Sequence, residues 1–123
     1  KAVSRVVQFI INNRGQILPP DFKLMDPFRV WFPPEYVKEK MIRWDRYEYD
    51  IGCLAGRLQE PVLIVEIGGP GDDSPHQYGN TAQLIKDGIA REYIERYHPR
   101  CRFQRIVKGD AWFDDELRKR LFL

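Results

Sequence analysis

The stretch that decides the fold is "EYDIGCLAGRLQEPVLIVEIGG", residues 48–69. Its second half is apolar at successive positions, which is typical of a strand in the middle of a sheet, covered on both faces. The segment 46–56 before it also predicts a strand, and the turn between the two lies near 56–60. The stretch therefore predicts two neighbouring strands. It also places Glu66 in the sheet interior, where a carboxylate is costly to bury without a partner.

Two acidic side chains are expected to meet on this hairpin. Side chains alternate along a strand, so Asp50 shares one face of the first strand and Glu66 one face of the second. If the strands are neighbours, the two carboxylates can converge on one face and suit a divalent ion with oxygen ligands. Such an ion can activate water and neutralise charge on a scissile phosphate. The alternatives are a strand-end role for Asp50 and a salt bridge to an arginine for Glu66.

The segments before the hairpin predict two helices and a strand. Residues 2–13 place apolar side chains at helical spacing; a hairpin turning at 12–15 is the alternative, and we favour the helix. Residues 16–34 contain five prolines, which exclude a long helix but allow a strand at 28–32. The proline pair 33–34 then predicts the start of a short helix.

The segments after the hairpin predict a loop, a helix, a strand and a second helix. The loop 68–80 has turn composition, and Asp72, Asp73 and His76 are interpreted as solvated loop residues. The helix that starts at Thr81 is expected to bury a stripe formed by Ala82, Ile85, Ile89 and Tyr93. A strand follows at 102–109, and then a helix over 110–123 with acids early and bases late. The element order indicates one α/β domain over residues 1–123, with a small mixed β-sheet flanked by helices.

Composition limits the classes of function. The net charge is +2 and the pI is near 8.6, values that permit a nucleic-acid partner without requiring one. Cys53 and Cys101 form no CxxC pair, so we expect no structural zinc site and interpret them as reduced thiols of a cytoplasmic protein. His76 and His98 flank no metal-ligand pattern. No apolar run approaches the ~18 residues of a membrane span. The chain starts at Lys1 rather than Met, which leaves room for a missing first element.

The hairpin resembles the core of the restriction-endonuclease-like fold, the PD-(D/E)xK phosphodiesterase superfamily. The resemblance covers residues 44–107 and is carried by "YDIGCL", by "VLIVEIGG" and by the helix and strand that follow. It implies a nuclease in which Asp50, Glu66 and the carbonyl of Ile67 bind Mg²⁺ or Mn²⁺.

The chain departs from this family at two points. Gly68 stands where the family usually has a lysine, and the resemblance implies that the following helix supplies that group through Gln83 or Lys86. The family often has an acid on its first helix; here only Gln8 could replace it, or Glu35 or Glu39 on the short helix.

Two functions follow as hypotheses. The first is a metal-dependent nuclease acting on DNA, with Arg43, Trp44, Arg46 and Tyr47 near the phosphate backbone. The second is a module that keeps the nuclease fold without activity and binds nucleic acid or a protein. The C-terminal segment "WFDDELRKRLFL" either packs on the core or forms the interface of a homodimer.

Overall fold

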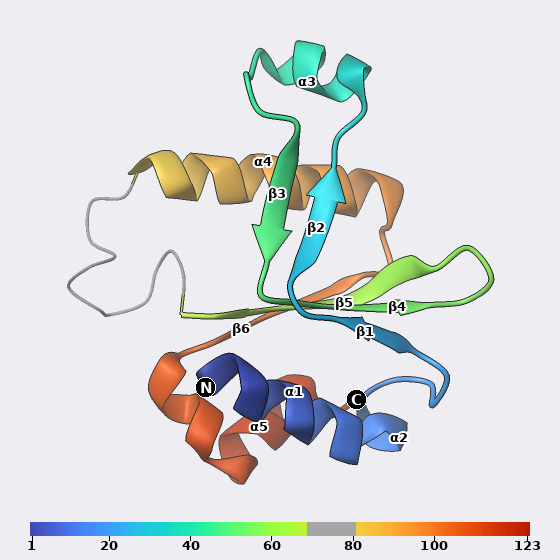
Figure 1. Cartoon of the computed structure of the whole chain (residues 1–123), viewed down its shortest axis with the longest axis vertical. Helices are drawn as coiled ribbons and strands as arrows, with labels where there is room; N and C mark the ends of the chain where they lie inside the picture. The colour runs from blue at the N-terminus through green and yellow to red at the C-terminus, as the bar shows by residue number, and fades with distance from the viewer. Residues whose placement is uncertain (69–80) are drawn as a thin grey trace.

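The structure is a computed structural model that describes residues 1–68 and 81–123. The chain forms a small mixed α/β domain with two sheets flanked by helices (Figure 1). The helices are α1 (Ala2–Asn12), α2 (Arg14–Ile17), α3 (Pro34–Lys40), α4 (Thr81–Tyr97), the 3₁₀ helix η2 (Lys108–Trp112) and α5 (Asp114–Leu121). The strands are β1 (Lys23–Met25), β2 (Phe28–Trp31), β3 (Arg46–Tyr49), β4 (Ile51–Ala55), β5 (Glu60–Ile67) and β6 (Arg102–Ile106).

The larger sheet has the strand order β1-β4-β5-β6. Its first three strands pair antiparallel, and β6 runs parallel to β5 because α4 returns the chain to the same end of the sheet. The strands β2 and β3 form a separate two-stranded ribbon. Figure 1 shows this ribbon standing away from the larger sheet and leading to α3.

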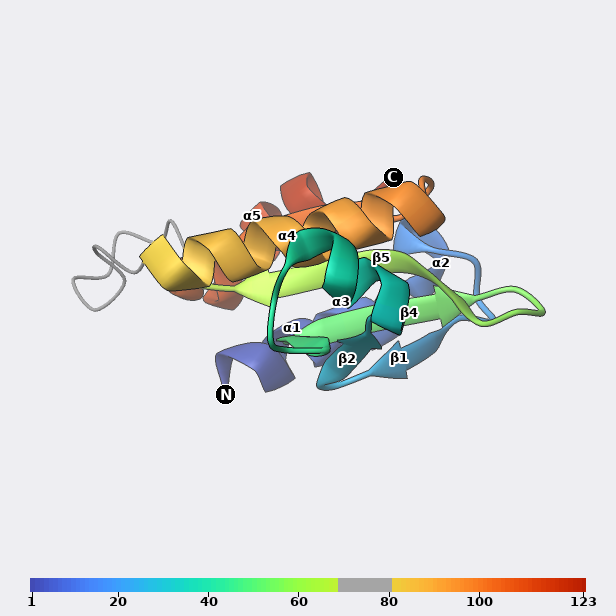
Figure 2. The ribbon, with the colours of Figure 1, turned by 90° about the horizontal axis from the view of Figure 1, so that it is seen from above.

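Strand β5 is the centre of the fold, as its apolar composition predicts. Leu63, Val65 and Ile67 pack into one core together with α1 and α5, whereas Ile64 packs into a second core with α4 and the ribbon. The view in Figure 2 shows α4 running along the sheet on the face that carries the second core. Burial on both faces explains why no polar residue occurs in β5 between Glu60 and Glu66.

Several predicted elements agree with the structure. Residues 2–12 are helical, so the hairpin alternative is wrong, and the short helix does begin at the proline pair, with Pro34 as its first residue. The C-terminal segment packs on the core through Leu117 and Leu121. It is divided into η2 and α5 rather than one helix, and α5 has acids in its first turn and bases in its last. The interpretations of Asp72, Asp73 and His76 concern residues outside the described part.

The first strand of the hairpin was predicted incorrectly. It is not one strand from 46 to 56, because the backbone bends at Asp50 and divides it into β3 and β4. Strand β3 pairs with β2, whereas β4 pairs with β1 and β5. Residues 46–56 therefore do not share one continuous strand face, although Ile51 still pairs with Val65 and keeps Asp50 at the end of β5.

The predicted buried stripe of α4 is also wrong. Ala82 and Ile85 are exposed, and Ile89 and Tyr93 are half-buried. The fully buried positions are Ala90 and Ile94, and the same helical face continues one and two turns earlier through Asp87 and Gln83. The inward face of α4 therefore carries two polar side chains over the end of β5.

Gly52 permits the ribbon to close over the larger sheet. A Cβ atom at this position would lie 2.3 Å from Cγ of Phe28, so the ring occupies the space of a side chain. We expect Gly52→Ala to lower the free energy of unfolding by about 1–3 kcal/mol, because the ring and its backbone must shift. Urea unfolding measures this change. Gly88→Ala on α4 is the control, since nothing lies within 4 Å of its added Cβ, and it should be neutral or stabilising. Equal stability of the two variants would contradict the prediction.

No helix in the described ranges is long and apolar enough to cross a membrane.

Candidate functional site

Asp50 and Glu66 are neighbours at the end of β5. Asp50 occupies the bend between β3 and β4, and its Oδ2 accepts a hydrogen bond of 2.8 Å from the backbone N–H of Ile67. This bond holds the Asp50 carboxylate beside Ile67, the last residue of β5. The negative charge of Asp50 also raises the pKa of Glu66, which places the two carboxylates within electrostatic reach of each other.

Asp87 on α4 is a third carboxylate at this point. Its side chain is only 17% exposed, and its charge is the largest electrostatic influence on Glu66. We refer to Asp50, Glu66 and Asp87 as the carboxylate cluster. The predicted third acids do not contribute to it: Glu39 on α3 is paired with Arg96 near the end of α4, about 13 Å along the helix from Asp87. Glu35 also lies on α3.

Arg105 on β6 is the cation nearest to the cluster. It lies directly across from Glu66 in the parallel ladder. Its Nη2 atom is 3.6 Å from Oε2 of Glu66 and 3.4 Å from Oδ2 of Asp87. Both distances are long for charge-assisted hydrogen bonds, and 41% of the Arg105 side chain is exposed. The ion pair therefore offsets the burial of Glu66 only in part.

The pKa of Glu66 records this imbalance. Burial is the largest cause that raises the pKa of Glu66, and the negative charge of Asp87 is the second. The positive charge of Arg105 lowers this pKa. The result is a pKa of about 7, against an ordinary 4.5. The Glu66 side chain is only 12% exposed. A carboxylate of this kind gains from any additional cation, because a cation offsets both the lost hydration and the repulsion.

Tyr47 and Gln83 connect α4 to the ribbon beside the cluster. The hydroxyl of Tyr47 donates to Oδ1 of Asp87 at 3.2 Å and accepts from Nε2 of Gln83 at 2.9 Å. Burial, followed by the charges of Glu66 and Asp87, raises the pKa of Tyr47, so the phenol stays protonated and keeps its donor role. Gln83, which was predicted to lie near the site, is thus held in place on the inward face of α4.

A small pocket of about 70 Å³ adjoins the cluster and is lined by Tyr49, Ile64, Glu66, Asp87, Arg91, Phe103, Gln104 and Arg105. Tyr49 is buried, and within the described ranges its hydroxyl has no hydrogen-bond partner. An unpartnered buried hydroxyl is unfavourable, whereas a polar pocket of this size has room for ordered water. The pocket is thus suited to the water molecules that surround a hydrated ion.

The ligands that a magnesium ion needs can be compared with those of the carboxylate cluster. Across residues 1–68 and 81–123, no group of three or more His, Cys, Asp or Glu side chains is arranged to hold a metal. Asp50 and Glu66 nevertheless supply two carboxylates. Mg²⁺ is typically bound by one or two carboxylates, several waters and the phosphates of a substrate. Asp50 and Glu66 are therefore the two carboxylates that could hold such an ion.

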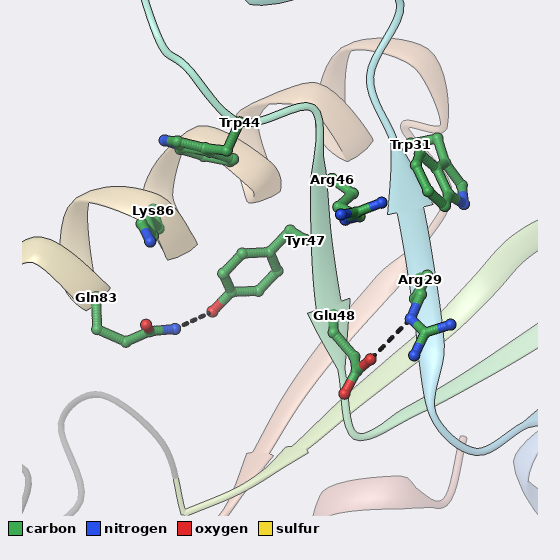
Figure 3. A pocket seen from close by; sticks show the side chains of 8 residues that line it. All are labelled: Arg29, Trp31, Trp44, Arg46, Tyr47, Glu48, Gln83 and Lys86. Atoms are coloured by element: carbon green, nitrogen blue, oxygen red, sulfur yellow. Dashed lines mark hydrogen bonds and ion pairs between the residues drawn. The ribbon is translucent and has the colours of Figure 1, made fainter.

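A larger pocket of about 660 Å³ lies beside the cluster and extends from α4 across β3 to the outer face of the ribbon (Figure 3). We call it the basic aromatic pocket; it is lined by Arg29, Trp31, Trp44, Arg46, Tyr47, Glu48, Gln83 and Lys86. Figure 3 shows Tyr47 reaching towards Gln83, with Trp44 and Lys86 on the side of α4 and Trp31 and Arg29 on the side of β2. Because Tyr47 and Gln83 also contact the site described above, the pocket and the carboxylate cluster share a wall.

The structure brings some predicted residues to this region and leaves others away from it. Trp44, Arg46 and Lys86 line the basic aromatic pocket, but Arg43, although exposed, does not. Gln8 lies on α1, on the opposite face of the sheet from α4, and bonds to Asn12 instead (Figure 1).

Two residues of the site were missed from the sequence: Asp87 and Arg105. Asp87 could have been found as the residue four positions after Gln83, one turn along the same helix face. Arg105 needed the register of the parallel pair β5–β6, which places it across from Glu66.

The cysteines provide no nucleophile. Both are free thiols, and burial raises the pKa of Cys53 and of Cys101 to about 12. Such thiols remain protonated at neutral pH and behave as small apolar residues.

Searches for similar proteins returned no matching family model, no matching curated protein and no matching solved structure.

Proposed function

We propose that this protein is a metal-dependent nuclease of the restriction-endonuclease-like class that hydrolyses phosphodiester bonds of DNA. One observation carries the proposal: Glu66, at the end of the central strand, is 12% exposed and has a pKa raised to about 7. Two further carboxylates lie within electrostatic reach of it. Such an arrangement weakens the fold in the absence of a cation and is typical of sites that bind one.

In this proposal Asp50 and Glu66 hold Mg²⁺ or Mn²⁺, with the carbonyl of Ile67 as the further ligand that the family resemblance implies. The bound ion would lower the pKa of a water molecule and neutralise charge on the scissile phosphate. The hydrogen bond from the N–H of Ile67 keeps one oxygen of Asp50 in place and leaves its other oxygen for the ion.

The remaining residues take separate roles. Gln83 lies on the inward face of α4 beside Asp87, so it is better placed than Lys86 to orient the attacking water, the role that the missing lysine at position 68 would have had. Lys86 is exposed and lies with its Nζ 5.9 Å from the ring of Trp44, in the basic aromatic pocket. We assign it to phosphate binding, together with Arg46.

A non-catalytic module is the second candidate. Arg105 already supplies a cation near Glu66 and Asp87. In addition, Gly68 stands at the position where the nuclease family usually has a lysine. In that case the fold would retain the basic aromatic pocket for binding nucleic acid or a protein, without any need for metal.

Calorimetry with Mn²⁺ distinguishes the two candidates. We expect heat of binding with the wild-type protein and none with Glu66→Gln, because the amide keeps the shape of the side chain and removes its charge. Glu60→Gln is the matched control: Glu60 lies at the opposite end of the same strand and its side chain is 55% exposed, so this variant should bind Mn²⁺ like the wild type. A folded wild-type protein that binds no Mn²⁺ would refute the nuclease and favour the module.

A further inference from the structure

The basic aromatic pocket combines uncompensated positive charge with two indole rings, of which that of Trp31 is exposed. Of its three cations, Arg29 is paired with Glu48 at 2.9 Å. Arg46 and Lys86 form no ion pair with any residue of the described ranges, and each lies instead against a tryptophan ring. The pocket therefore attracts an anion and offers two cations that are ready to bind it.

The two tryptophans differ in how firmly the fold holds them. Trp44 is half-buried and packs edge-on against Phe32, with ring centroids 5.5 Å apart. Trp31 lies on the outer face of the ribbon and is 55% exposed, and the guanidinium carbon of Arg46 is 4.9 Å from its ring centroid. Trp31 and Arg46 face each other across β2 and β3, so this pair is fixed by the strand register. The fold gains little from an exposed indole at this place.

A DNA duplex could contact the two cations of the pocket but not the ring of Trp31. The phosphates of a duplex can reach Arg46 and Lys86, but its bases are stacked on one another and leave no face for Trp31. An unpaired nucleotide presents both a phosphate and a free base, and bases stack on aromatic side chains regardless of sequence. A volume of about 660 Å³ is within the range of pockets that bind small organic ligands, so it can accept a nucleotide.

We infer that the basic aromatic pocket binds an unpaired nucleotide of single-stranded DNA, with the base on Trp31 and the flanking phosphates at Arg46 and Lys86. The inference rests on the proposed function for its ligand, which is nucleic acid, but it does not depend on cleavage or on the carboxylate cluster. Its consequence is a preference of the protein for single-stranded or splayed ends over intact duplex.

The test is fluorescence anisotropy with a labelled twelve-residue oligothymidylate and with the same strand annealed to its complement. Measurements are made in EDTA at low salt, so that binding is separated from cleavage and a failed metal site does not affect the result. We expect the single strand to bind more tightly than the duplex. Trp31→Ala should weaken binding of the single strand roughly tenfold and leave duplex binding unchanged.

Two further variants make the result specific. Trp112→Ala is the matched control, because Trp112 is 57% exposed on η2, outside the pocket, and its removal should not change binding. Lys86→Ala should weaken both ligands and reduce the slope of log affinity against log salt by about one. The inference is overturned if duplex binds as tightly as single strand, if Trp31→Ala and Trp112→Ala behave alike, or if neither ligand binds the folded protein.

Discussion

The exchange of Asp50 for asparagine is expected to lower the rate of Mg²⁺-dependent DNA cleavage by roughly 10²- to 10³-fold, the usual loss when one electrostatic contact to the reacting groups is removed. The amide oxygen of Asn can still accept the hydrogen bond from the N–H of Ile67, which is 2.8 Å long in the wild type. The bend between β3 and β4 should therefore survive, and the loss should reflect the missing charge rather than a damaged fold. The measurement is single-turnover cleavage of end-labelled single-stranded and duplex DNA.

Controls for this experiment come from the same strands. Glu60→Gln should cleave at the wild-type rate, because Glu60 lies at the far end of β5 and its side chain is 55% exposed. Circular dichroism before and after addition of Mg²⁺ shows whether the Asp50 variant is folded. Cleavage by Asp50→Asn at the wild-type rate would remove Asp50 from the site, and an inactive wild type that nevertheless binds Mn²⁺ would assign the ion a structural role.

The central strand and most helices could be predicted because each depends on local pattern. An apolar run with no alternation requires cover on both faces, and β5 has two cores, one on each side. The helical spacing in residues 2–13 requires one buried face, and α1 buries Val6, Phe9 and Ile10. In these elements the local sequence alone determines which faces must be buried.

The break at Asp50 could not be predicted, because it depends on which strands become neighbours. The alternation from Arg46 to Gly52 is equally compatible with one long strand and with two short ones. The strand is divided because β3 pairs with β2, whereas β4 pairs with β1 and β5. Pairing between distant segments is set by the packing of the whole domain, which a local pattern does not contain.

The third carboxylate was missed for a related reason. The apolar residues of α4 suggest a stripe through Ile85 and Ile89, which is displaced from the face that meets the sheet. The face that meets the sheet carries Gln83 and Asp87 before Ala90 and Ile94. Gln83 and Asp87 are half-buried on the face that packs on the sheet, which departs from the amphipathic rule. Such departures are expected where a fold carries a functional site.

The raised pKa of Glu66 predicts that the free energy of unfolding falls as the pH rises. The carboxyl of Glu66 has a pKa of about 7 in the folded protein against an ordinary 4.5, so between these values the folded state binds more protons than the unfolded state. Stability is then greatest below pH 4.5, as far as this group is concerned, and is lost as the pH rises through 7. At 1.4 kcal/mol per tenfold change in proton affinity, the loss is about 3 kcal/mol by pH 8.

Glu66→Gln isolates this contribution. The glutamine is neutral at every pH, so the variant should exceed the wild type in free energy of unfolding by about 2–3 kcal/mol at pH 8 and match it near pH 4.5. Urea unfolding at the two pH values measures the difference, and Glu60→Gln, exposed on the same strand, should show no such pH dependence. If the two proteins differ in free energy of unfolding by the same amount at both pH values, the pKa of Glu66 is not raised in the folded protein. If Mg²⁺ removes the wild-type deficit at pH 8 but leaves Glu66→Gln unchanged, the instability of the metal-free protein arises at the residue that binds the ion.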